Sequence, residues 1–80
     1  MEPFVGQIIE VGFDFAPEDW AFCDGQTLKI SGNEKLFSLL DTKYGGDGRI
    51  TFALPDLRER VSNNKLNYII CLNGKYPQRS

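Results

Sequence analysis

The sequence predicts an α+β fold, namely a small antiparallel β-rich domain with one short helix at about residues 32–43. Three observations predict this fold. Apolar and polar residues alternate near the N-terminus, one segment has the 3–4 spacing of an amphipathic helix, and an apolar run near the C-terminus is typical of a buried strand. The 80 residues are expected to form a single domain, residues 1–80, with a small core.

Two strands are expected in the first third of the chain. Residues 5–15 place apolar side chains at alternate positions, with Ile8 the one apolar residue on the opposite face. Trp20–Cys23 has the pattern of a second strand. The dipeptide Asp24-Gly25 favours a type I′ turn, so residues 26–30 should fold back on Trp20–Cys23 as a β-hairpin.

The helix is predicted from its ends and from its apolar stripe. Ser31 and Glu34 have the spacing of a capping box, in which each residue binds the backbone amide of the other. Gly45 is placed to end the helix in a left-handed conformation. The apolar stripe consists of Leu36, Phe37, Leu39, Leu40 and Tyr44.

A glycine-rich loop follows the helix. Tyr44-Gly45-Gly46-Asp47-Gly48 has three glycines in its last four residues, so the backbone is expected to turn sharply and to approach another segment closely. The order helix, loop, strand differs from that of phosphate-binding loops, which lead from a strand into a helix. Asp47 also lacks the companion acids of a calcium loop. The loop is therefore interpreted as a structural turn.

The segment after this loop is expected to be extended. A short apolar strand ends at Pro55, which cannot donate to a sheet ladder, and the Asp56 side chain is expected to bind neighbouring amides. Leu57–Val61 is expected to continue as a strand with Arg58 and Arg60 on one face.

The C-terminal apolar run and the cysteines are assigned to the core. Tyr68–Leu72 is apolar on both faces, which favours the centre of a sheet. Cys23 and Cys71 lie in strand-like runs and are interpreted as small buried hydrophobic residues. The chain has no histidine, and two separated cysteines do not make a tetrahedral site, so no metal and no cofactor are expected.

Net charge and the lengths of the apolar runs argue against two classes of partner, nucleic acid and membrane. A net charge of −2 gives no basis for binding nucleic acid, and no run approaches the roughly 20 apolar residues of a membrane span. Because the N-terminus lacks the pattern of a signal peptide, synthesis as a soluble chain in the cytoplasm is expected.

Glu2–Asp24 carries six acids and no base, whereas Leu57–Ser80 carries five bases and one acid. These charges could pair within the chain or between subunits.

No catalytic constellation is apparent. Asp24, Asp47, Asp56 and Glu59 could be imagined as glycosidase carboxylates, but nothing local places two of them together. The aromatic residues, Trp20 among them, are assigned mainly to the core rather than to a sugar-stacking platform. The chain is therefore not expected to be an enzyme.

Three segments in order, Trp20–Gly25, Phe37–Val61 and Leu66–Gly74, resemble the phage tail collar domain family, which includes microcystin-dependent-type bacterial proteins. The resemblance implies a non-enzymatic module of tail fibres or phage-like particles, commonly trimeric. Together with the turn chemistry, it gives these structural or interface candidates: Trp20, Asp24, Gly25, Tyr44, Gly45, Gly46, Asp47, Gly48, Pro55, Asp56, Arg58 and Arg60.

The sequence also departs from the family pattern. Relatives carry a long variable insertion, which can include histidine-ligated metal or receptor contacts, where only Ser62–Leu66 stand here. Binding functions located in that insertion are therefore not carried over. Glu59 and Ser62 replace a glycine and a proline of the family, so the strand is expected to continue where relatives bend.

Two hypotheses of function remain. The first is a structural collar module that associates with itself, with a trimer favoured by the resemblance, or docks with other tail or fibre proteins in a virion tail. Arg58 and Arg60 would then orient an oligomer by meeting acids of the next subunit. The alternative is a small stand-alone binding protein, which recognises a saccharide or interferes with phage assembly by mimicking the collar.

Overall fold

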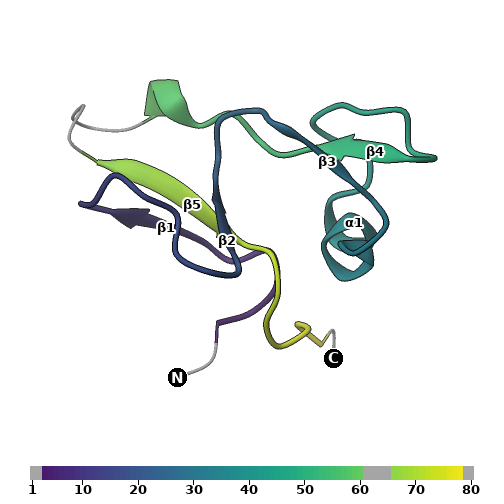
Figure 1. The fold of residues 1–80 in the computed structure, drawn as a ribbon, viewed down its shortest axis with the longest axis horizontal. Coiled ribbons are helices and arrows are strands. Elements are labelled where there is room, and N and C mark those ends of the chain that lie inside the picture. The colour runs from purple at the N-terminus through teal and green to yellow at the C-terminus, as the bar shows by residue number, and fades with distance from the viewer. Residues whose placement is uncertain (1–2, 61–65, 79–80) are drawn as a thin grey trace.

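The computed structural model describes residues 3–60 and 66–78 and shows two small antiparallel sheets with one helix (Figure 1). The predicted α+β class with one short helix is confirmed. The elements, in chain order, are β1 (Ile8–Val11), β2 (Trp20–Phe22), β3 (Thr27–Lys29), α1 (Glu34–Leu40), β4 (Thr51–Ala53), a 3₁₀ turn (Arg58–Arg60) and β5 (Asn67–Cys71).

The larger sheet has the order β1-β5-β2, with β5 antiparallel to both neighbours. Ile69, Ile70 and Cys71 of β5 are buried, which confirms the prediction that the apolar run forms a central strand. Ile70 lies opposite Ile8 on one side and Ala21 on the other. The last strand of the chain therefore holds the first two together.

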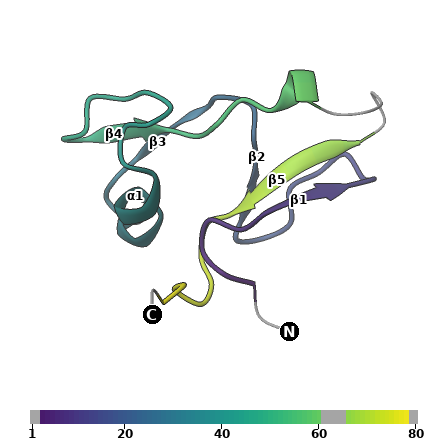
Figure 2. The ribbon, with the colours of Figure 1, turned by 180° about the vertical axis from the view of Figure 1, so that it is seen from behind.

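The smaller sheet pairs β3 with β4, and α1 lies along one side of it (Figures 1 and 2). The Phe37 and Phe52 rings meet edge to face with centroids 5.4 Å apart. Such a pair adds about 0.5–1.5 kcal/mol to the effect of burial. One core cluster joins both sheets and the helix through Val5, Ala21, Cys23, Leu36, Phe52, Leu54 and Ile70.

The predicted hairpin between residues 20–23 and 26–30 is wrong. β2 pairs with β5 and β3 pairs with β4, so the two segments do not pair with each other. Gly25 has φ +82°, but Asp24 does not have the positive φ that a type I′ turn also requires. Pairing of β2 with β5 helps to bury Ile69 and Ile70 of β5, and full burial of an isoleucine is worth roughly 1.5–3 kcal/mol, more than a local turn preference.

The predicted strand over residues 5–15 is reduced to β1. Gly6 takes φ +85° and interrupts the extended backbone, and the N-terminal alternation does not correspond to one buried face. Val5 and Val11 are buried, whereas Ile9, Phe13 and Phe15 are exposed.

Helix α1 is shorter than predicted at both ends. Its N-cap is Asn33 rather than Ser31, without a side-chain capping bond, and the Glu34 carboxylate accepts the amide of Gly32 at 3.2 Å. Its C-cap is Asp41, at φ +52°, rather than Gly45. Of the predicted stripe, Leu36 is fully buried, while Tyr44 lies beyond the helix and is exposed.

The segment after Pro55 does not continue as a strand. Arg58–Arg60 is a 3₁₀ turn, in which the Arg60 amide donates to the Leu57 carbonyl at 2.9 Å. Arg58 and Arg60 therefore do not share one face of a strand, and Glu59 lies in a turn where continued extension was expected. The Asp56 side chain accepts the Arg58 amide at 3.2 Å, which favours a turn over extension. Val61 and Ser62 lie outside the described residues.

Candidate functional site

The glycine-rich loop is built by a close approach of two backbones. Gly45, Gly46 and Gly48 have φ of +130°, +94° and +75°. A Cβ at Gly46 would lie 2.4 Å from the Phe52 Cα and 2.7 Å from the Thr51 carbonyl oxygen. The close approach expected from the sequence is confirmed, because β4 leaves no space for a side chain at Gly46.

Asp47 fixes the same loop through its carboxylate. Its Oδ1 accepts the amides of Arg49, Ile50 and Thr51 at 2.9, 2.9 and 3.0 Å. These backbone hydrogen bonds lower the pKa of Asp47 to about 2, with Thr51 the largest contributor. One oxygen of the carboxylate is thus taken up by amides of its own loop, which is consistent with a structural turn.

A second group of predicted residues meets where β2 ends. Asp24 forms an antiparallel bridge with Asp56, and the Gly25 amide donates to the carbonyl of the buried Pro55 at 3.2 Å. Asp24 Oδ1 accepts the Gln26 amide at 3.2 Å. The structure therefore brings Asp24-Gly25 and Pro55-Asp56 together, although the pairing expected of Asp24-Gly25 was with residues 26–30.

Arg58 is bound within this group. Its Nε and Nη2 donate to Oδ1 and Oδ2 of Asp56 at 2.9 and 2.7 Å, a bidentate pair. The Arg58 side chain and amide lower the pKa of Asp56 to about 2. The carboxylate that binds Arg58 is thus that of Asp56, two residues earlier in the chain, and not one from the acidic segment Glu2–Asp24.

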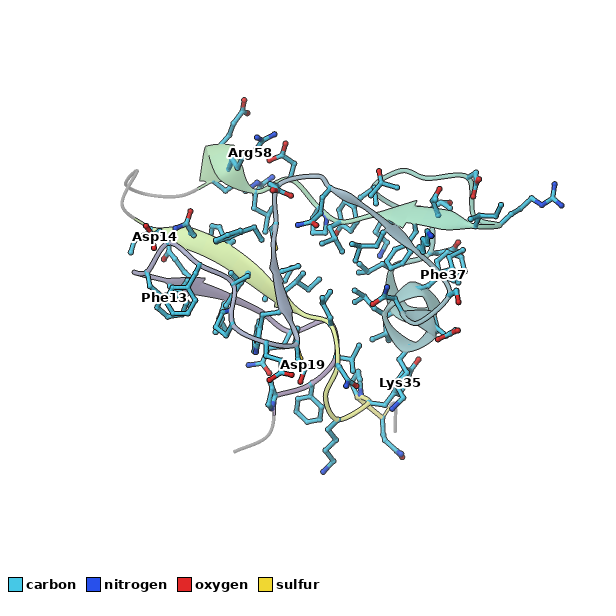
Figure 3. All side chains as sticks on the ribbon, in the orientation of Figure 1. Phe13, Asp14, Asp19, Lys35, Phe37 and Arg58 are labelled. Atoms are coloured by element: carbon cyan, nitrogen blue, oxygen red, sulfur yellow. The ribbon has the colours of Figure 1, made fainter. Side chains whose placement is uncertain are left out.

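An open hollow of about 470 Å³ lies beside this group. Asp14, Phe22 and Tyr68 line it together with Asp24 and Arg58. Figure 3 shows Asp14 and Arg58 at the same end of the molecule, although they come from distant segments. Sequence reasoning missed Asp14, Phe22 and Tyr68, because no local pattern indicates that β2, β5 and the loop after β1 meet.

Cys23 also lines this hollow and is buried. Burial, with the neighbouring charge of Asp24, raises its pKa to about 11. The thiol is therefore protonated at neutral pH and is a poor nucleophile. Cys71 is likewise a buried free thiol, so both cysteines belong to the core as predicted.

The remaining residues that the sequence singled out lie away from the group formed by Asp24, Gly25, Pro55 and Asp56. The loop Tyr44–Gly48 packs along β4, where the Gly45 carbonyl accepts the Ala53 amide at 3.1 Å, and Trp20 lies opposite Cys71 in the larger sheet. Arg60 is an exposed residue of the 3₁₀ turn. Within residues 3–60 and 66–78, no three acidic, cysteine or histidine side chains cluster to hold a metal ion. The described helix is too short to cross a membrane.

A family model, the Phage Tail Collar Domain, matches residues 6–62 of this chain. The match spans the elements from β1 to the 3₁₀ turn and stops before β5. No curated protein matches the chain.

Proposed function

Because the chain belongs to the phage tail collar domain family, we propose that it is a non-enzymatic structural module that acts by self-association or docking in a phage-like tail or fibre. The family match is the observation that carries this proposal. The match also supports a proposed place in a virion tail, and a trimer is the assembly that the resemblance favours.

The hydrogen bonds made by the carboxylates of Asp47 and Asp56 support this proposal. Asp47 holds three backbone amides and Asp56 holds Arg58, so both carboxylates stabilise the loops of their own chain. A general acid or base needs a carboxyl free to exchange a proton with substrate at working pH. The lowered pKa values of these two groups favour a structural role.

The test is the mass of the purified chain in solution, measured by light scattering from low to high micromolar concentration, together with electron microscopy of any assembly. Self-association or incorporation into tail-like particles is the expected result. A strictly monomeric chain that joins no tail or fibre protein would contradict the proposal.

The hollow beside Asp56 favours a second candidate, a small stand-alone binding protein. Phe22 and Tyr68 offer apolar surface, while Asp14, Asp24 and Arg58 offer hydrogen-bonding groups, a combination that suits a saccharide. Titration of a saccharide library, followed by the amide resonances of these residues, tests it. Saturable shifts confined to the hollow would favour this function, and their absence would exclude it for the sugars used.

A further inference from the structure

The turn that leads into β4 presents two exposed side chains at one end of the molecule. Ile50 is 65% accessible, more than any other large apolar side chain of the described residues, and Arg49 beside it is exposed as well. The backbone that carries them is fixed, because Asp47 Oδ1 accepts both of their amides at 2.9 Å and the Ile50 carbonyl accepts the Ile30 amide at 2.8 Å. We call Arg49-Ile50 the tip.

A fixed tip with an exposed isoleucine suits a contact with a partner. The isoleucine leaves apolar surface in water, and the fixed backbone means that little conformational entropy is lost when the tip is bound. Other exposed apolar side chains have contacts within the chain. Phe13 and Phe15 stack with ring centroids 4.7 Å apart, and the hydroxyls of Tyr76 and Ser38 share a hydrogen bond of 2.8 Å. The tip is therefore the better candidate for an anchor.

The open hollow of about 470 Å³ has a character complementary to that of the tip. Phe22 and Tyr68 give it apolar surface, which suits an isoleucine. The carboxylates of Asp14 and Asp24 form no ion pair within residues 3–60 and 66–78, so they can receive a guanidinium. The charge of Arg58, which also lines the hollow, is balanced by its own bidentate pair.

The tip and the hollow lie at opposite ends of the molecule. β4 starts at the end away from the larger sheet (Figures 1 and 2), whereas Asp14 and Arg58 lie at the end that the larger sheet forms (Figure 3). The tip therefore reaches the hollow of another copy and not that of its own chain. A contact between two different surfaces is head-to-tail, and such contacts close into a ring when the rotation between copies allows it.

We propose that the tip of one copy of this chain occupies the hollow of a second copy, so that three copies close into a ring. This inference rests on the proposed function, because it names the surfaces through which the module associates. Ile50 would lie against the aromatic side chains of the hollow, and Arg49 would meet the carboxylates of Asp14 and Asp24. Each copy provides one tip and one hollow, so the ring leaves neither unused.

Charge and closure favour a second copy over other occupants. The hollow takes its two unpaired carboxylates from the acidic segment Glu2–Asp24. The tip supplies a cation that forms no ion pair with the described residues of its own chain. Such complementarity orients a contact whose affinity comes mainly from apolar burial. A ring of three copies also agrees with the trimer of the proposed function.

Three single substitutions, compared by light scattering at micromolar concentration, test the tip. Ile50→Asp places a charge against the aromatic side chains of the hollow and should abolish the trimer. Arg49→Glu opposes the carboxylates of the hollow and should weaken association roughly tenfold or more. Lys35→Glu makes the same change in charge at an exposed residue of α1 and should associate like the wild type. Equal effects of Arg49→Glu and Lys35→Glu would overturn the proposal.

Mixing two variants tests whether the contact is head-to-tail. Asp14→Lys damages the hollow and keeps the tip, while Ile50→Asp damages the tip and keeps the hollow. Asp14 is chosen over Asp24 because the Asp24 carboxylate accepts the Gln26 amide. Each variant alone should be monomeric, whereas an equimolar mixture should form a one-to-one dimer through the intact tip and the intact hollow. A mixture that stays monomeric, or single variants that still form trimers, would overturn the proposal.

Circular dichroism and thermal unfolding establish that each variant is folded. The substituted side chains are all exposed, so none of the changes should unfold the chain. Loss of the fold in Ile50→Asp or Asp14→Lys would itself contradict the exposure on which the contact depends.

The outcomes separate this inference from the proposed function. A trimer lost in Ile50→Asp and kept in Lys35→Glu, with a one-to-one dimer in the mixture, supports both. An oligomer that Ile50→Asp leaves intact overturns the tip contact but keeps self-association. A monomeric chain that still joins a tail particle overturns the tip contact and supports docking, whereas a monomer that joins none contradicts both. Saturable saccharide shifts in the hollow of an intact trimer also overturn the tip contact, because the hollow would then be open.

Discussion

Replacing Gly46 with alanine is the sharpest test of how the glycine-rich loop is built. The residue combines φ +94° with a backbone contact that leaves no space for a methyl group. Gly32 provides a matched control, because it has φ +88° but nothing within 4 Å of an added Cβ. The two substitutions therefore share the strain in φ and differ in the steric overlap.

The magnitudes follow from this difference. A left-handed conformation costs an alanine roughly 1–2 kcal/mol, so Gly32→Ala should lower the Tm by about 5–15 °C. At Gly46 the 2.4 Å approach to Phe52 must also be relieved by moving backbone, which adds about 1–3 kcal/mol as in an overpacked core. Because domains of this size rarely exceed about 3–5 kcal/mol of stability, Gly46→Ala should be largely unfolded.

Thermal and urea unfolding of the wild type and both variants, followed by circular dichroism, measure these effects. If Gly46→Ala and Gly32→Ala lower the Tm equally, the close approach between the loop and β4 does not exist as described. If neither variant changes the Tm, the positive φ values themselves are wrong.

Four further results are expected. In the folded chain the pKa values of Asp47 and Asp56 are lowered to about 2, whereas an aspartate in the unfolded chain has a pKa of about 3.9. The stability that the two carboxylates contribute is therefore present above about pH 4 and is lost as the pH falls toward about 2. Asp47→Asn should make this loss of stability smaller in acid unfolding curves. Cys23 and Cys71 should react with a thiol reagent at pH 8 only as fast as the chain opens, and a rate equal to that of a free thiol would contradict their burial. The purified protein should carry no stoichiometric transition metal, and a chelator should leave its melting curve unchanged; one equivalent of zinc or iron would refute this. Arg58→Glu should leave the solution mass unchanged at low and high salt, because Arg58 binds Asp56 of its own chain; a salt-dependent loss of association would support the intersubunit role that the sequence suggests for this arginine.

The local conformation of the backbone and the burial of single segments could be predicted from the sequence at several positions. Three glycines around Asp47 can be explained by a tight turn alone, and the structure shows that turn with three amides on one carboxylate oxygen. The burial of β5 was equally predictable, because a strand that is apolar on both faces needs neighbours on both sides. In each case one short segment contains all the information.

The pairing of distant segments could not be predicted in the same way. Asp24-Gly25 has strong turn chemistry, yet it lies against Pro55-Asp56, because β2 gains more by pairing with β5 than with the next segment. The apolar alternation of residues 5–15 gave no sign that Gly6 would interrupt the strand. The hollow lined by Asp14 and Tyr68 depends on these pairings, so it was not predictable either.

The arrangement of the larger sheet also bears on how the chain assembles. β1 and β2 belong to the acidic segment Glu2–Asp24, and both flank β5, which belongs to the basic segment Leu57–Ser80. From the sequence, the opposite charges of these segments were expected to pair either within the chain or between subunits. The described ion pair is instead the local one between Arg58 and Asp56, and both side chains are largely exposed, a setting in which attraction is weak and screened by salt. The Arg58–Asp56 pair therefore fixes the local turn of its own chain and adds little to any contact between subunits.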